Sequence, residues 1–194
     1  MKKLMVLAAA ALMACSCAQT TKVMTKDFLD LATERYSVRS FAKTPVEQEK
    51  IDKILRAGQV APTAVNSQPQ MIYVVTSEEG IAKLNAVSPC LYGAPSCFIF
   101  CYNDNTVCKR GAEDNYGDID VTIVLTHMML EAANLGIGTV PVGYYDEAKL
   151  VEAFQLPANI HPILIMPFGY ASEDAKPSDR HSSYRPLEET VEYR

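Results

Sequence analysis

The stretch DIDVTIVLTHMMLEAANLGIG, residues 118–138, predicts the central element of the fold. Its apolar residues recur at the three- and four-residue spacing of an α-helix, as Val121, Leu125, Met128 and Ala132 show. Gly136 is the expected stop, because glycine tolerates the left-handed conformation that ends many helices. We therefore predict a helix from about Asp118 to Leu135. Apolar residues on several of its sides indicate that this helix is buried.

Shorter elements surround this helix. Runs rich in β-branched and aromatic residues predict strands at 71–76, 96–102, 140–144 and 160–168. Helical spacing predicts helices at 27–34, 78–87 and 147–155. A further helix is expected to start at Thr44 as N-cap, with Pro45 in its first turn and Glu47 completing a capping box. The polar tail from Ser172 onward has few apolar residues, so we expect it to dock on this molecule or on a second copy.

The first 17 residues carry the features of a secretory signal: a basic start, a short apolar run and small residues at the cut. Within them, Leu12-Met13-Ala14-Cys15 resembles a bacterial lipobox, in which Cys15 becomes the lipidated first residue. We predict a signal peptide at 1–14, a lipidated tether at 15–25 and a single domain at 26–194. The product would be an exported cell-envelope lipoprotein of a bacterium, held on the membrane only through its lipid anchor. The alternatives are an ordinary signal peptide and a cut before Cys17.

Size and charge exclude other classes of protein. The chain has 194 residues, which is enough for one domain with its own core. Its formal net charge is −5, and a general nucleic-acid binder needs clustered basic residues, so no nucleic-acid partner is expected. No window supplies the roughly 20 apolar residues of a spanning helix.

Four cysteines lie beyond the signal region: Cys90, Cys97, Cys101 and Cys108. Export permits disulfides, and bridges from Cys90 to Cys97 or to Cys108 remain open. Cys97 and Cys101 lie in a run typical of a buried strand, where they share one face but are too far apart to bond. We favour free buried thiols that pack as small hydrophobic groups. No cysteine pair has the spacing of a metal site, and no metal is expected.

Hydrolase and nucleotide-hydrolysing motifs are missing from the sequence. Gly136-Ile137-Gly138 follows a predicted helix instead of opening one, so we interpret it as a helix end in tight approach to a strand, not as a dinucleotide fingerprint. His127 and His161 are interpreted as packed or structural residues. These motifs and histidines supply no candidate catalytic side chain.

One segment carries groups suited to bind an anion, and a second carries groups suited to bind the edge of a heterocyclic ring. Arg35, Ser37 and Arg39 alternate, so on an extended backbone they share one face and form a phosphate or carboxylate cradle. A loop of small and polar residues follows the second helix and offers amides and a hydroxyl to the edge of a heterocycle; it includes Pro62, Thr63, Ala64, Asn66 and Gln68. Together with Arg185 in the tail, these segments predict a phosphorylated ligand that bears a ring.

The chain resembles the nitroreductase family of flavin mononucleotide (FMN) enzymes. The matching motifs lie in order over nearly all of residues 26–194, and their order makes the match specific. They are Arg35-Tyr36-Ser37-Val38-Arg39-Ser40-Phe41, Ala61-Pro62-Thr63-Ala64-Val65-Asn66-Ser67-Gln68-Pro69, Glu131-Ala132-Ala133-Asn134-Leu135-Gly136-Ile137-Gly138, Val140-Pro141-Val142-Gly143-Tyr144 and Arg185-Pro186-Leu187-Glu188-Glu189-Thr190-Val191.

This resemblance implies an α+β fold, a nitroreductase-like sandwich whose mainly antiparallel sheet is flanked by helices. It also implies an intertwined homodimer with two FMN molecules in the interface and with each tail reaching over the partner. By position, Arg35, Ser37 and Arg185 would hold the phosphate and ribityl chain, and Arg39 would face the pyrimidine edge of the flavin. Other positions would line the cofactor, partly from the other subunit: Tyr36, Pro62, Thr63, Ala64, Asn66 and Gln68. The backbone at Val142 and Gly143 would lie at flavin N5. Ser183 stands where many members carry lysine, and Arg180, His181 or Lys176 would replace its charge.

The resemblance implies an oxidoreductase that passes hydride from a donor such as NAD(P)H, through FMN, to a nitroaromatic, quinone or similar electron-poor acceptor. One alternative is a flavin-dependent reductive dehalogenase or a flavin-processing relative. The other is a non-catalytic surface lipoprotein that binds a small ligand. Nicotinamide cofactors are cytoplasmic, so an exported enzyme would need another electron donor.

Overall fold

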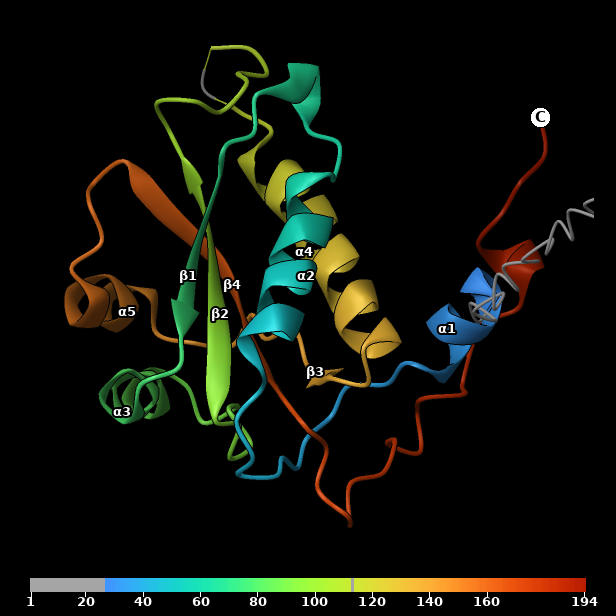
Figure 1. Ribbon diagram of the computed structural model, residues 1–194. Coiled ribbons are helices and arrows are strands. Elements are labelled where there is room, and N and C mark those ends of the chain that lie inside the picture. The colour runs from blue at the N-terminus through green and yellow to red at the C-terminus, as the bar shows by residue number, and fades with distance from the viewer. Residues whose placement is uncertain (1–26, 113) are drawn as a thin grey trace, which may run out of the picture.

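The computed structural model describes residues 27–112 and 114–194 (Figure 1). The predicted signal peptide at 1–14, the tether at 15–25 and the lipidation of Cys15 lie outside the described residues and stay predictions. Within the described part of the chain, no helix is both long enough and apolar enough to cross a membrane.

One antiparallel sheet of four strands forms the middle layer, in the order β1-β2-β4-β3. The strands are β1 at Gln70–Val75, β2 at Ser96–Asn103, β3 at Gly138–Thr139 and β4 at Ile160–Gly169. β2 lies between β1 and β4, and its first six residues are all buried. Because side chains alternate along a strand, Cys97 and Ile99 join the core on one face of the sheet, while Phe98 and Phe100 join the core on the other.

Helices cover both faces of this sheet (Figure 1). They are α1 at Phe28–Glu34, α2 at Gln48–Gln59, α3 at Glu78–Val87, α4 at Gly117–Asn134 and α5 at Glu147–Phe154. Two short 3₁₀ turns, η1 at Ala64–Asn66 and η2 at Leu187–Glu189, complete the secondary structure. α2 and α4 pack on the face of Phe98 and Phe100, whereas α3 and α5 pack on the opposite face. The predicted α+β class and helix-flanked antiparallel sheet are confirmed.

The long central helix also forms as predicted. Val121, Val124 and Met128 of α4 are fully buried. A Cβ atom added at Gly58 of α2 would lie 2.7 Å from the Sδ atom of Met128, so the missing side chain lets the two helices approach closely. Gly136 follows the end of α4 with a φ of +74°, which is the left-handed conformation expected of a glycine that ends a helix.

The predicted capping box at Thr44 is wrong. α2 begins at Gln48, three residues after Pro45, where the helix was expected to start. Its N-cap is Glu47, whose side chain makes no capping hydrogen bond. The Glu47 carboxylate instead accepts a hydrogen bond of 2.6 Å from the hydroxyl of Tyr170 at the end of the sheet. A tertiary contact therefore uses the side chain that the local pattern assigned to capping.

The predicted strand at 140–144 is displaced toward the N-terminus. Regular pairing with β4 is confined to Gly138 and Thr139. Farther along, the Val140 N–H donates a 3.2 Å hydrogen bond to the Pro167 carbonyl, and Val142 pairs with Ile165 through two backbone hydrogen bonds of 2.8 and 3.0 Å. Pro167 has no N–H to return the bond to Val140, which explains why the ladder is incomplete between these points.

The four described cysteines are free thiols, so neither Cys90–Cys97 nor Cys90–Cys108 is a disulfide. Cys97 and Cys101 lie on the same buried face of β2, as predicted. Burial raises the pKa of both thiols, that of Cys101 to about 12. These two thiols therefore stay protonated and act as small packing groups.

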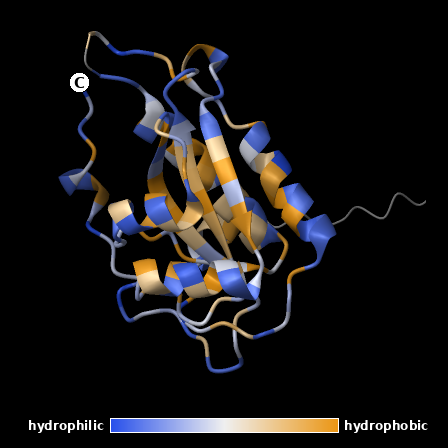
Figure 2. Cartoon of the chain, turned by 90° about the vertical axis from the view of Figure 1, so that its left-hand side faces the viewer, coloured by the Kyte–Doolittle hydropathy of each residue, from blue (hydrophilic) through white to orange (hydrophobic). Residues whose placement is uncertain are grey.

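The tail from Ser172 runs outside the helical layers and contributes no buried residue (Figure 2). Its apolar side chains have little cover: Tyr184 is 71% exposed, Leu187 75% and Tyr193 96%. An ordered segment with uncovered apolar groups fits the expectation that the tail docks on another surface.

Candidate functional site

The segment from Arg35 to Arg39 runs beside β3 in parallel orientation. Ser37 bridges Thr139, and the Val38 N–H donates a 3.0 Å hydrogen bond to the Thr139 carbonyl. Tyr36 and Val38 contact the core on the α3/α5 face of the sheet. Alternation along an extended backbone would turn Arg35, Ser37 and Arg39 away from that core, and their shared face stays a prediction.

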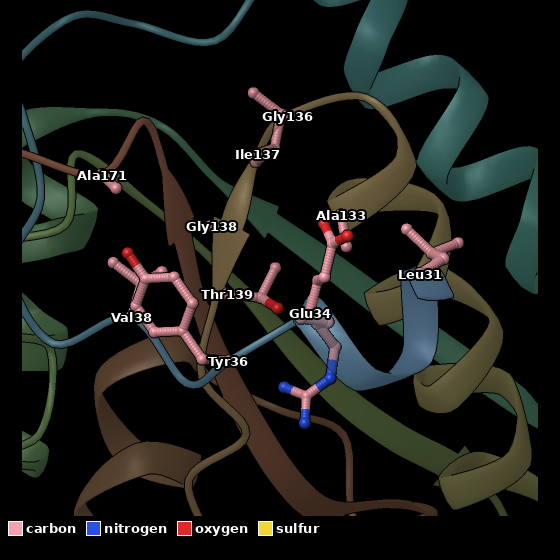
Figure 3. A pocket seen from close by; sticks show the side chains of 11 residues that line it. Leu31, Glu34, Tyr36, Val38, Ala133, Gly136, Ile137, Gly138, Thr139 and Ala171 are labelled. Atoms are coloured by element: carbon pink, nitrogen blue, oxygen red, sulfur yellow. The ribbon is translucent and has the colours of Figure 1, made fainter. Parts of the chain in front are cut away.

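A pocket of about 210 Å³ opens between this segment and the C-terminal end of α4 (Figure 3). Leu31 and Ala133 lie on one side of β3, and Tyr36 and Val38 lie on the other. The remaining lining residues come from α1, the loop after α4, β3 and the start of the tail: Glu34, Arg35, Gly136, Ile137, Gly138, Thr139 and Ala171. The volume is below the roughly 300–1,000 Å³ of most ligand pockets.

Arg35 carries the clearest sign of an anion site. Its Nη1 atom is buried and has no hydrogen-bond partner among the described residues. Leaving a charged donor buried without a partner costs free energy, so natural proteins do this rarely and at functional positions. A phosphate group in this pocket would supply the missing acceptor. The residues present therefore fit a phosphorylated cofactor.

Arg39 lies farther along the same segment. Its Nη1 atom donates a 3.3 Å hydrogen bond to the Ser37 carbonyl, and its guanidinium carbon lies 6.0 Å from the centre of the Tyr92 ring. The single parallel bridge between Ser37 and Thr139 lies just before Arg39, and beyond it Phe41 pairs with Ala171. The predicted position of Arg39 near Val142 and Gly143 stays a prediction.

The second predicted segment is a loop held in an unusual conformation. Val65, Asn66 and Gln68 all have positive φ angles, of 48°, 57° and 47°. Such angles are uncommon outside glycine and are most unfavourable for a β-branched residue such as Val65. Two hydrogen bonds hold the loop: the Gln68 N–H donates to Thr63 Oγ1 at 3.0 Å, and the Ala64 N–H donates to Asp120 Oδ1 at 2.9 Å. Pro62 lies exposed at its start.

These two segments lie at opposite ends of α4. The loop is bound to Asp120 in the first turn of the helix, while the pocket at Arg35 contacts Ala133 in its last turn. Thirteen residues of helix separate the two positions by about 20 Å, at roughly 1.5 Å per residue. One chain therefore does not bring the two predicted segments together.

Arg185 is also separate from the cradle. Its Nε atom pairs with the Glu189 carboxylate at 3.1 Å within the tail, and its side chain is 70% exposed. The tail contacts the cradle elsewhere, because the His181 ring lies edge-on to Tyr36, with 6.2 Å between centroids. The predicted role of Arg185 at the phosphate is not assembled within one chain.

Asp120 is the residue that sequence reasoning missed. Its side chain is only 2% exposed, and its Oδ2 atom is buried without a partner among the described residues. The sequence offered one signal, an acidic residue in the first turn of an apolar helix, but acidic residues there are common. His127 contacts the Ile123 carbonyl one turn back in α4, and His161 contacts the Asp104 carboxylate, 57 residues away. The described residues contain no group of side chains suited to a metal ion.

Fold and site together define a class of protein: an α+β sandwich with a pocket lined by Arg35 at one end of its central helix and a strained polar loop at the other. The model of the nitroreductase family matches residues 32–91 and 88–170. The chain belongs to this family.

Three known proteins give the degree of similarity. The crystal structure of a nitroreductase family protein from Clostridium difficile is 38% identical, covers 87% of this chain and 98% of its own, and superimposes with a TM-score of 0.81. A structure from Desulfovibrio desulfuricans that holds FMN shares the fold, with a TM-score of 0.75 at 23% identity over 87% of this chain and 97% of its own. The FMN reductase [NAD(P)H] of Bacillus subtilis is 29% identical over 161 residues, which are 73% of this chain and 64% of that protein.

Proposed function

We propose that this protein is an FMN-dependent oxidoreductase that works as a homodimer, with NAD(P)H or another reduced donor and a small electron-poor acceptor such as a nitroaromatic or a quinone. The observation that carries the proposal is the buried, unpartnered Nη1 of Arg35 in the pocket beside β3. The names of the Bacillus and Desulfovibrio relatives support FMN as the cofactor.

Each part of the site has a distinct task in this proposal. FMN, once bound here, would supply the hydride-transfer chemistry between donor and acceptor. Arg35 and Ser37 bind the phosphate and ribityl chain, and Arg39 provides positive charge where the reduced ring carries negative charge. The backbone at Val142 and Gly143 orients the reactive edge of the ring. No side chain has to move a proton, because solvent reaches the exposed Gly143.

The first expected result concerns the cofactor itself. The purified full chain, stripped of flavin, should bind FMN with saturation and then oxidise NAD(P)H when menadione is supplied as acceptor. Riboflavin, which has the same ring but no phosphate, should bind at least tenfold more weakly, because it leaves Arg35 without its partner. Fluorescence titration measures both affinities. Equal affinities for FMN and riboflavin would contradict the anion role, and absence of FMN binding would overturn the proposed function.

The second expected result concerns the dimer, in which each site takes Arg35 from one chain and the 62–68 loop from its partner. Arg35→Gln and Gln68→Ala variants should each bind FMN poorly as homodimers. When the two are refolded together, half of the dimers are mixed, and each mixed dimer has one intact site, so about a quarter of normal FMN binding should return. Bound FMN per chain is the measurement. If mixing restores nothing, the two segments do not complete one site across the interface.

A further inference from the structure

The loop between α3 and β2 packs against the segment that follows the cradle. It runs from Ser88 to Pro95, and Leu91 anchors it in the core with 1% exposure. Lys43, just beyond the cradle, donates a 3.2 Å hydrogen bond to the Gly93 carbonyl. None of the sequence motifs used above includes this loop.

Tyr92 in this loop has a backbone conformation that is rare for its residue type. Its φ is +53°, in the left-handed region, and Gly93 follows at +75°. Bulky residues seldom adopt such angles, and those that do cluster at functional sites, where the surrounding structure holds them. The conformation turns the Tyr92 ring toward Arg39.

Two side chains contact Tyr92. The guanidinium of Arg39 lies 6.0 Å from the ring centre, at the limit of a cation–π contact. Interaction with Cys90 and burial raise the pKa of Tyr92, while the positive charge of Arg39 opposes that rise. The ring contact with Arg39 is therefore accompanied by an electrostatic interaction with the same side chain.

The same loop also holds the backbone that is proposed to orient the flavin. Ser88 is 2% exposed, and its hydroxyl donates a 2.7 Å hydrogen bond to the Tyr144 carbonyl while accepting one of 3.1 Å from the Cys90 N–H. One short loop is thus tied to Arg39 through Tyr92 and to the 142–144 segment through Ser88.

We propose that Tyr92 is a positioning residue that holds the Arg39 guanidinium against the cofactor site and thereby favours the reduced over the oxidised flavin. This inference rests on the proposed function. It predicts that Tyr92 acts through Arg39, and that its effect is seen in the reduction potential of the bound flavin more than in the fold.

The test compares reduction potentials in wild type and variants. Tyr92→Asn removes the ring and suits the left-handed backbone, because asparagine tolerates that region. It should lower the preference for reduced over oxidised FMN about tenfold, which for a two-electron couple is a shift of roughly 30 mV to more negative potential. Tyr92→Phe keeps the ring and should retain most of the wild-type potential. Tyr73→Phe, in β1, is the matched control and should change nothing.

A double-mutant cycle separates this role from a merely structural one. In an Arg39→Ala background, Tyr92→Asn should cause no further shift in potential. An equal shift with and without Arg39, or no shift in either background, would overturn the inference. Wild-type protein that fails to bind FMN would overturn the proposed function instead, so the two failures are distinguishable.

Discussion

Replacing Arg35 with glutamine is expected to weaken FMN binding on the order of 10- to 100-fold and to leave the unfolding free energy of the apoprotein unchanged or slightly higher. The loss follows from the value of hydrogen bonds to charged groups, about 1.5–3 kcal/mol, of which each 1.4 kcal/mol corresponds to a tenfold change in affinity. The buried Nη1 atom has no partner without ligand, so its removal takes no hydrogen bond from the apoprotein.

Weaker FMN binding together with an unchanged or slightly higher unfolding free energy distinguishes a binding residue from a structural one. A structural arginine would lower stability when removed, and its loss would affect FMN only through the fold. Isothermal titration calorimetry measures the affinity, and denaturant unfolding of the apoprotein measures the stability. Arg56→Gln is the control, because Arg56 lies exposed on α2, where it pairs with Gln59. A destabilised apoprotein with unchanged FMN affinity would reverse the assignment of Arg35.

The elements that could be predicted from the sequence are those whose pattern is local. The apolar periodicity of α4 and the glycine at its end define that helix because both act within a few turns. The start of α2 could not be predicted, because Glu47 is held by Tyr170, 123 residues away, and no local pattern shows such a contact.

The same distinction between local patterns and distant contacts holds for the candidate site. Arg35 and the 62–68 loop are recognisable as segments, but only the structure shows that α4 holds them at opposite ends. Asp120 and Tyr92 were missed because their importance lies in what they contact: the N–H of Ala64 and the guanidinium of Arg39. A sequence pattern shows which residue types follow one another along the chain. It does not show these contacts, because each of them joins two different elements of the fold.

Gly138 tests whether the cradle depends on close approach to β3. A Cβ atom at this position would lie 2.6 Å from Val38 Cγ2 and 3.0 Å from its Cβ. Val38 cannot easily turn aside, because it is β-branched and 3% exposed. Gly138→Ala should therefore push Val38 away and break its hydrogen bond to Thr139. We expect the unfolding free energy to fall by about 1–3 kcal/mol, as in other overpacked cores.

The same displacement should also weaken FMN binding, because Arg35 and Ser37 lie on the segment that moves. Val38→Ala removes both Cγ atoms and makes room, so the double variant Gly138→Ala/Val38→Ala should bind FMN more tightly and be more stable than the sum of the two single changes predicts. Denaturant unfolding and FMN titration of all four proteins measure this coupling. Additive losses in stability and affinity would show that Gly138 and Val38 do not set the distance between the cradle and β3.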